Sequence, residues 1–387
     1  MACHDNDVNI KMKSFPVPLI KYTTGTLKGA HYGIVSKQQN PTRCPMKKVT
    51  IHDVAELAGV SIKTVSRVVN NESAVRENTK IKVSEAIKAL NYKPNLSARN
   101  LRGTQTFIFG LLYDNANAYY VVDMQNGLLS ECLEKNYELL IRPCDSHAPD
   151  IVKQVSDLIH HSRLAGLILT PPLADNPEIL DHLKEIELPY VRITSGKAIP
   201  GKCEDGIFVD DEAASMHITD HLISLGHKRI AYITGDMTHE SSPNRLNGHL
   251  AALKKAGIPS DPALILHKDY SFESGVQGFK ELLELDELPT AAVGGNDEVA
   301  AGILYCARLN DISVPGDLAI AGFENSPFSR QTWPKLTTAS QPNTEIARRA
   351  AQLLIKLCRP DRSPEQDASQ HCFIPELIVR GSTAADS

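Results

Sequence analysis

The sequence predicts a small all-α unit near the N-terminus, followed by a larger α/β body. Charge separates the two: residues 46–104 carry eleven Lys and Arg against five Asp and Glu, a net +6, while residues 105–387 carry twenty-four against thirty-nine, a net −15. Pattern separates them too, because helix caps and turn residues crowd the basic segment, whereas short apolar runs alternate with amphipathic stretches in the body. A length of 387 residues suits about two or three domains of ordinary size.

Composition excludes several classes of protein. With 42% hydrophobic residues and no apolar run near the roughly 18 to 20 residues of a membrane span, a membrane protein is excluded. The eight cysteines contain no C-x-x-C pair, which indicates reduced thiols rather than a disulfide or zinc framework. The first 45 residues lack the apolar core of a secretory signal, so we expect a cytoplasmic protein. The net charge of −5 argues against a nucleic-acid partner only until the +6 segment is counted separately.

Two helices joined by a tight turn are predicted at the start of the basic segment. Thr50 and Asp53 fit the S/T-x-x-D/E pattern of a capping box, so a helix begins here. Gly59 can adopt the positive φ that ends a helix, and Ser61 can cap the next one. A third helix fits residues 77–90. This arrangement is a helix-turn-helix, whose second helix enters the DNA major groove by its N-terminal half.

The second helix has an apolar side and a polar side. Val65 and Val68 can face inward, and the residues left facing outward near its N-terminal half are Ile62, Lys63, Ser66 and Arg67. Beyond the third helix, N-Y-K-P-N at 91–95 precedes a short helical stretch at 96–102. This stretch is too short to be a stable helix alone in water, so it should fold only when something holds it.

Residues 49–70 (VTIHDVAELAGVSIKTVSRVVN) and 91–95 (NYKPN) resemble the DNA-binding headpiece of the lactose/galactose repressor (LacI/GalR) family of bacterial transcription regulators. The likeness extends over about 46–382, and it implies a headpiece at 46–94, a hinge helix and linker at 95–104, and double-stranded operator DNA as the partner. It also implies that the second helix reads bases and that a hinge leucine wedges into the minor groove. The residues expected to contact DNA are Thr50, Ser61, Ile62, Lys63, Thr64, Ser66, Arg67, Asn70, Asn95, Ala98 and Leu101.

Two features differ from the family pattern. Arg76 stands where the family usually places a small N-cap residue, so either the third helix starts less firmly or Arg76 contacts a phosphate. Residues 1–45, with a net charge of +4, precede M-K-K-V-T at 46–50, which resembles the usual beginning of such a repressor. We therefore interpret 1–45 as a disordered extension or as the product of a mis-assigned start codon.

The body is predicted to contain parallel sheets covered by helices, because apolar runs alternate with amphipathic stretches such as 121–134 and 213–225. Ligands in such folds bind beyond the carboxyl ends of the strands. The expected strands are 107–112, 138–141, 166–169, 190–193, 207–209, 230–233, 291–293 and 318–321.

The family resemblance implies that the body consists of two periplasmic-binding-protein-like lobes with a small-molecule cleft between them. The chain is expected to cross between the lobes near Val209 and again near Gln341. The expected bounds of the body, 105–387, are about 105–209 and 340–371 for lobe one and about 210–339 and 372–382 for lobe two.

Polar and aromatic side chains at the expected strand ends are the candidates for binding a ligand. Tyr119 and Tyr120 beside Asp114 suit a sugar, because the rings can stack on its C–H face while the carboxylate bonds its hydroxyls. Arg245 stands where the resemblance places an arginine that holds ligand hydroxyls or carboxylates, and Glu324 stands where the family usually carries Asp. The expected ligand-binding residues are Asp114, Tyr119, Tyr120, Thr194, Arg245, Asn296, Glu324 and Trp333.

Each candidate also has a purely structural interpretation. Asp297 before a helix suits an N-cap, an isolated Arg is usually a surface ion pair, and Trp333 can pack at the seam between the lobes. His217 and His221 have metal-ligand spacing, but no H-E-x-x-H pattern and no third ligand accompany them. The sequence contains neither a P-loop nor a G-x-S-x-G elbow, so we expect no enzyme, no metal and no cofactor.

We expect a sequence-specific DNA-binding transcriptional regulator, most simply a repressor of carbohydrate-utilisation genes that a small sugar or glycoside inducer releases from its operator. Because no leucine heptad follows Ser382, a homodimer is favoured over a coiled-coil tetramer. A corepressor-dependent repressor or an activator of the same family remains open, whereas a sugar-binding transport protein would need a signal peptide and no headpiece. We expect the protein in the bacterial cytoplasm, on the nucleoid when bound to DNA, with no membrane partner.

Overall fold

The computed structural model describes residues 49–69, 75–92, 106–115, 117–197, 206–358 and 371–384. The chain divides into two compact units between residues 93 and 94. The extension at 1–45 and the hinge at 95–104 lie outside the described residues. Within the described part of the chain, no helix is both long enough and apolar enough to cross a membrane.

The first unit contains the predicted helix-turn-helix. Helix α1 (Ile51–Ala58) begins at the capping box, where the Thr50 amide and hydroxyl both donate to Asp53 Oδ2 at 2.7 Å. It ends at Gly59, whose φ of 65° is the left-handed conformation that glycine adopts at little cost. Ser61 then caps helix α2 (Ile62–Val69), since its Oγ accepts from the Thr64 amide at 3.1 Å. The local signals therefore fix both helix starts and the turn between them.

Helix α3 (Glu77–Ala89) completes the headpiece core. Arg76 occupies its N-cap position without a side-chain capping hydrogen bond, and Asn91 ends the segment in the left-handed region. The three helices pack around one small apolar cluster, formed by the buried residues Val54, Ala55, Val65, Val68, Val83 and Ala86.

Lobe one of the body is a parallel six-stranded sheet with the order β11-β5-β4-β3-β1-β2. Its strands are β1 (Ile108–Tyr113), β2 (Glu138–Pro143), β3 (Gly166–Leu169), β4 (Tyr190–Ser195), β5 (Gly206–Val209) and β11 (Cys372–Phe373). One face packs on α5 (Ala118–Glu134) and α13 (Asn343–Leu357), the other on α6 (Ile151–Ser162) and α7 (Pro177–Glu185). Alternation decides which residue meets which face: Ile168 belongs to the first cluster and its neighbours Leu167 and Leu169 to the second.

Lobe two repeats this architecture with the order β12-β10-β9-β8-β6-β7, in which β12 runs antiparallel to β10. Its strands are β6 (Ile230–Ile233), β7 (Ile265–Leu266), β8 (Ala291–Gly294), β9 (Ala319–Phe323), β10 (Thr337–Ser340) and β12 (Glu376–Ile378). Helices α8 (Asp211–Ser224) and α9 (Ser241–Lys255) cover one face, and α10 (Phe272–Leu283) and α11 (Asp297–Leu309) cover the other. The short α12 (Pro327–Gln331) follows β9.

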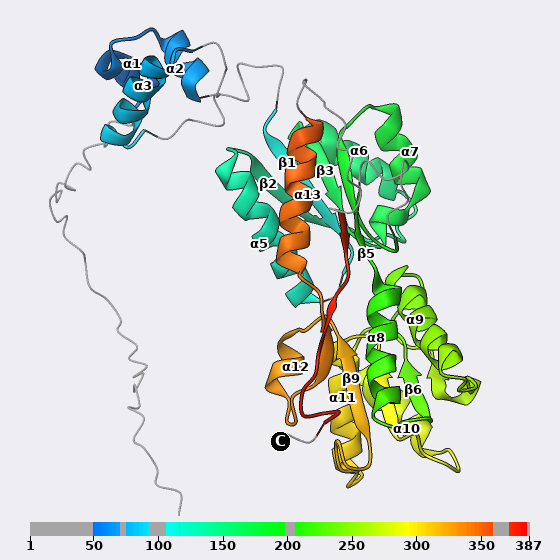
Figure 1. Ribbon diagram of the computed structural model, residues 1–387. Helices are drawn as coiled ribbons and strands as arrows, with labels where there is room; N and C mark the ends of the chain where they lie inside the picture. The colour runs from blue at the N-terminus through cyan, green and yellow to red at the C-terminus, as the bar shows by residue number, and fades with distance from the viewer. Residues whose placement is uncertain are drawn as a thin grey trace, which may run out of the picture. The chain divides into compact units, whose positions relative to one another are not determined.

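Within the described residues of the body, the chain passes between the lobes three times (Figure 1). It leaves lobe one after β5, returns between β10 and α13, and leaves again between β11 and β12. The last passage corrects the expected bounds, which gave 372–382 to lobe two. Cys372 and Phe373 pair in parallel with Phe208 and Val209 of β5, so lobe one extends to residue 373.

Candidate functional site

The headpiece presents the N-terminal half of α2 as its candidate DNA-reading surface. Ser61, Ile62, Lys63 and Arg67 are exposed, whereas Val65 and Val68 are buried in the headpiece core. Thr64 and Ser66 are half-buried, and the Thr64 hydroxyl lies 2.9 Å from that of Ser61. Thr50 is exposed, with its hydroxyl bonded to Asp53. The other predicted DNA contacts, Asn70, Asn95, Ala98 and Leu101, lie outside the described residues.

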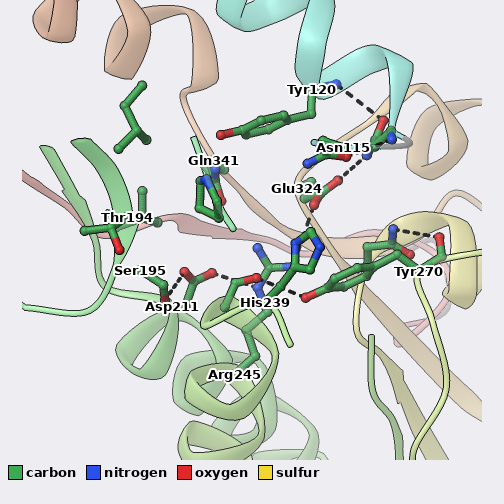
Figure 2. A pocket seen from close by; sticks show the side chains of 16 residues that line it. Asn115, Tyr120, Thr194, Ser195, Asp211, His239, Arg245, Tyr270, Glu324 and Gln341 are labelled. Atoms are coloured by element: carbon green, nitrogen blue, oxygen red, sulfur yellow. Dashed lines mark hydrogen bonds and ion pairs between the residues drawn. The ribbon is translucent and has the colours of Figure 1, made fainter. Parts of the chain in front are cut away.

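The body contains a polar cavity of about 60 Å³ between its lobes. The side chains that line it follow the carboxyl ends of strands from both sheets, where parallel α/β sheets bind their ligands. Figure 2 shows Tyr120 of α5 on one side and Arg245 of α9 on the other. The lining residues are Asn115, Asn117, Tyr120, Pro171, Ile193, Thr194, Ser195, Val209, Asp211, His239, Ser241, Arg245, Tyr270, Asn296, Glu324 and Gln341.

Arg245 is the centre of the polar network in this cavity. It is only 4% exposed, and its Nε donates to Asp211 Oδ1 at 2.7 Å. Its Nη1 donates to the Gly295 carbonyl at 2.8 Å and lies 3.7 Å from Glu324 Oε1. The guanidinium also lies 3.7 Å from the centre of the Phe323 ring. A buried cation needs such partners, because an unpaired charge is costly to remove from water.

Glu324 is the most perturbed acid of the cavity. It follows β9 with a φ of 97°, and its Oε2 accepts from Asn117 Nδ2 at 2.7 Å. Burial raises the pKa of Glu324 to about 7, against the opposing charge of Arg245. Its carboxyl group therefore changes protonation near neutral pH.

Polar bonds cross the cavity from one lobe to the other. Asn117 caps α5 in lobe one and bonds Glu324 in lobe two. Ser195, at the end of β4, donates to Asp211 Oδ2 at 2.6 Å and accepts from Asn244 Nδ2 at 3.0 Å, and both partners belong to lobe two. These hydrogen bonds join the two lobes directly, so they can form only while the lobes lie this close together.

Several polar groups at the cavity remain open to a ligand. The Tyr120 hydroxyl and the His239 ring nitrogens make no hydrogen bond to other described residues, and the Asn115 amide uses only its oxygen, toward Asn117. Gln341 Oε1 is buried without a partner among the described residues. These donors and acceptors surround an aromatic ring, the arrangement that suits a hydroxyl-rich molecule.

Comparison with known proteins decides the family. Residues 50–95 match bacterial regulatory proteins of the lacI family, and residues 219–383 match the periplasmic binding protein-like domain. The transcriptional regulator DegA of Bacillus subtilis is 32% identical over 339 residues, covering 87% of this chain and 98% of DegA. The chain belongs to the lacI family. This lacI-family protein is therefore a DNA-binding transcriptional regulator and not an enzyme.

Solved structures agree with this assignment of the lacI-family regulator. The lac repressor dimer bound to operator and an anti-inducer is 27% identical with a TM-score of 0.69, covering 88% of this chain and all of that one. The CelR regulator in complex with cellobiose is 26% identical with a TM-score of 0.64, covering 86% of this chain and 99% of that one. The predicted combination of a helix-turn-helix headpiece with a two-lobe α/β body is confirmed.

The structure of this lacI-family regulator brings five of the eight expected ligand-binding residues to the cavity: Tyr120, Thr194, Arg245, Asn296 and Glu324. Two of them already have structural partners. The Thr194 hydroxyl donates to Asp175 at 2.8 Å, while Asn296 caps α11 through Val299 and donates to the Tyr270 carbonyl. Asn296 rather than Asp297 is thus the N-cap. Tyr120, Arg245 and Glu324 are the stronger candidates for ligand contact.

The other three expected residues do not line the cavity. Asp114 instead accepts the Ser146 amide at 2.8 Å. Trp333 is 71% exposed, so the alternative that it packs at the seam between the lobes is wrong as well. Tyr119 lies in a separate groove of about 500 Å³, which shares Asn117, Tyr120, Glu324 and Gln341 with the cavity. Tyr120 therefore lines both the cavity and the groove, whereas Tyr119 lines the groove alone.

Sequence reasoning missed most of the other polar residues of the cavity, among them Asn117, Ser195, Asp211, His239, Ser241, Tyr270 and Gln341. Ser195 and Asp211 carried a usable signal, because each lies two residues after the end of an expected strand. Tyr270 carried none, since it follows β7, a strand of two residues.

In the histidine pair noted in α8, His221 Nε2 lies 2.9 Å from the Thr383 hydroxyl. Among the described residues, one group of three possible metal ligands gathers at Asp114, Asp145 and His147. Asp145 and His147 are exposed, and the two aspartates already accept backbone amides, Asp114 that of Ser146 and Asp145 that of His147. We assign no metal to this group.

Proposed function

We propose that this regulator is a dimeric repressor of carbohydrate-utilisation genes, and that a sugar or glycoside bound in the cavity releases it from its operator. The lac repressor was solved as a dimer on its operator, and CelR with cellobiose, which supports operator DNA, a second copy and a sugar as partners here. The regulator would act on the nucleoid in the bacterial cytoplasm. It needs no cofactor for this role.

The observation that carries the proposal is the cavity itself. Its open donors and acceptors, with the Tyr120 ring beside them, match the alternating hydroxyls and C–H faces of a sugar. A binding role therefore explains these residues.

Cavity size links ligand binding to movement of the lobes. A volume of about 60 Å³ holds only a few water molecules, whereas pockets for small molecules usually measure about 300 Å³ or more. A sugar can enter only if the lobes move apart or the lining side chains rearrange. The hydrogen bonds Asn117–Glu324 and Ser195–Asp211 would then break, and the ligand would take over their groups.

Such a change can control DNA binding if the ligand prefers one arrangement of the lobes. Shifting the regulator from almost wholly bound to almost wholly free requires a difference of about 5.5 kcal/mol in ligand affinity between the two states. Each headpiece would read a half-site in the major groove, and the hinge segments would carry the change in lobe spacing to the headpieces.

The test is an electrophoretic shift of the regulator on its native promoter, with and without a panel of sugars and glycosides. Release of DNA by one of them supports the inducer mechanism. A ligand that strengthens DNA binding would favour the corepressor alternative, and transcription that rises with occupancy would favour the activator.

Tyr120→Phe should raise the inducer concentration that gives half-release about tenfold, while leaving ligand-free operator binding unchanged. The variant removes one hydroxyl that faces the cavity but keeps the ring, and a lost ligand hydrogen bond costs about 1 to 1.5 kcal/mol. Tyr119→Phe is the matched control: it removes the neighbouring hydroxyl, which lines the groove and not the cavity. Equal effects of the two substitutions on the titration would place the sugar elsewhere.

A further inference from the structure

The charges that line the cavity are unbalanced. Its ionisable residues, other than tyrosine, are Asp211, Glu324, Arg245 and His239, and no lysine lines it. Burial lowers the pKa of His239, so its ring is neutral at neutral pH and adds no cation. Arg245 is therefore the sole permanent positive charge among the lining residues, opposite the Asp211 carboxylate and Glu324, whose carboxyl group with a pKa of about 7 is partly ionised at neutral pH.

The positive charge of Arg245 is already paired with these two acids. Asp211 Oδ1 lies 2.7 Å from its Nε, and Glu324 Oε1 lies 3.7 Å from its Nη1. The Gly295 carbonyl occupies a further donor at 2.8 Å. Asp211 is itself held in place by Ser195, and Glu324 by Asn117, so neither acid can turn away without breaking another bond.

The surroundings of the cavity are acidic as well. The negative charge of Asp297 contributes to raising the pKa of Glu324. The charges of Asp236 and Asp114 likewise act to raise the pKa of His239. Arg245 and His147 have the opposite effect and act to lower the pKa of His239. A recess that is lined by an excess of one sign of charge and has low-dielectric walls focuses the electric field of those charges. Here the excess charge is negative, so the field repels anions.

We propose that the cavity selects an uncharged, hydroxyl-rich ligand, and that Asp211 and Glu324 are the specificity residues that exclude sugar acids and sugar phosphates by neutralising Arg245. This inference deepens the proposed function and rests on the same cavity. It separates this regulator from one in which an unpaired arginine would hold the carboxylate or phosphate of its effector. The cavity should therefore bind glucose-like sugars and uncharged glycosides, but not sugar acids such as uronates or sugars phosphorylated at the 6-hydroxyl.

The test uses inorganic phosphate as the anionic probe and the full-length chain. Binding is measured by isothermal titration calorimetry in wild type, in Asp211→Asn/Glu324→Gln, and in the same double variant with Arg245→Met added. The amide substitutions keep the shape of both acids but leave the arginine charge uncompensated. We expect phosphate to bind the cavity of wild type only weakly, at least tenfold more tightly in the double variant, and no more tightly than wild type in the triple variant.

The triple variant also serves as the control for phosphate bound to the basic headpiece, because headpiece binding persists in all three proteins. Phosphate binding that is as tight in wild type as in the double variant and is lost in the triple variant would overturn the proposal, and so would a double variant that gains nothing. If the double variant fails to fold, Glu324→Gln alone, which keeps the Asp211–Arg245 pair, should still bind phosphate at least threefold tighter than wild type.

This experiment needs no DNA and no known inducer, so its outcome is independent of the operator test. If the protein excludes phosphate in this way but no sugar releases it from DNA, the charge selectivity stands and the proposed function is wrong. Conversely, a regulator released by a sugar phosphate more readily than by the parent sugar would lose the selectivity and retain its role as an inducible repressor.

Discussion

Arg245 lines the cavity and also has a structural role. The resemblance placed it correctly at the cavity, but only the folded chain shows that Asp211, Glu324 and the Gly295 carbonyl occupy its donors. Its side chain is 5% exposed and that of Asp211 is 3% exposed. A substitution here changes two properties at once, ligand contact and the solvation of a buried acid.

Arg245→Ala should therefore lower the free energy of unfolding by about 3 to 5 kcal/mol, because it leaves Asp211 buried without its counter-ion. Urea denaturation of the full chain measures this. Arg229→Ala is the matched control, since Arg229 pairs with Asp261 at the surface and its loss should cost at most about 1 kcal/mol. Similar costs for the two arginines would show that the cavity pair is solvated like a surface pair.

Glu324 should make the body less stable as the pH rises. Its pKa is raised from 4.5 in the unfolded chain to about 7 in the folded one, so the folded state holds an extra proton between these values. The resulting stability is complete below about pH 4.5 and is lost as the pH passes through 7. Across that window the contribution amounts to up to about 3 kcal/mol.

Denaturation of wild type and Glu324→Gln at several pH values between 4 and 8 isolates this contribution, because other groups titrate alike in both proteins. The stability of wild type relative to the variant should fall toward high pH. A constant difference would show that Glu324 keeps an ordinary pKa.

At the scale of elements, glycines set how closely the helices of the body approach. A Cβ at Gly248 of α9 would lie 2.1 Å from the Glu212 carbonyl oxygen of α8, and one at Gly302 of α11 would lie 2.2 Å from the Phe272 carbonyl oxygen of α10. Gly127 of α5 meets the Thr344 carbonyl of α13 in the same way, at 2.2 Å. Each helix pair thus packs backbone against backbone at one crossing.

Gly248→Ala should destabilise lobe two by about 1 to 3 kcal/mol, because the new methyl group forces α8 and α9 apart. Asn247→Ala, one residue earlier on the exposed side of α9, should change stability by no more than about 0.5 kcal/mol. Thermal unfolding of both variants gives the comparison. A neutral Gly248→Ala would mean that the helices can shift without losing their packing.

Strand prediction succeeded where strands are apolar and failed where they are short or polar. All eight expected strands occur, with ends that differ by up to two residues. The other described strands are not among the eight: β7 and β11 have only two residues, β12 has three, and β10 reads T-T-A-S. Thr337 and Thr338 of β10 are fully buried, and their hydroxyls bond Thr383 and Asp297, partners that local pattern cannot reveal.

At the scale of the whole molecule, the two units carry opposite charge. The segment 46–104 has a net +6 and the segment 105–387 a net −15. Contacts to phosphate should come from the basic segment alone, since the acidic body is repelled by DNA.

Operator affinity should consequently fall about a thousandfold or more between 50 and 200 mM salt, as expected for about six phosphate contacts that release counterions. Fluorescence anisotropy of a labelled operator fragment at several salt concentrations measures the slope. Ligand affinity of the cavity for an uncharged sugar is the internal control and should barely change over the same range. An operator affinity that ignores salt would contradict a mainly electrostatic contact.

The sequence by itself determined the headpiece, the alternation of strands and helices, and the class of regulator. These rest on signals between near neighbours, such as the Thr50–Asp53 cap and the left-handed Gly59, which the folded chain reproduces. Only the tertiary structure decided which side chains share the cavity. Asn117 and Glu324 are 207 residues apart, and they meet because sheet order and lobe crossing bring separate strand ends together. No local pattern encodes that meeting, since it depends on how both cores pack.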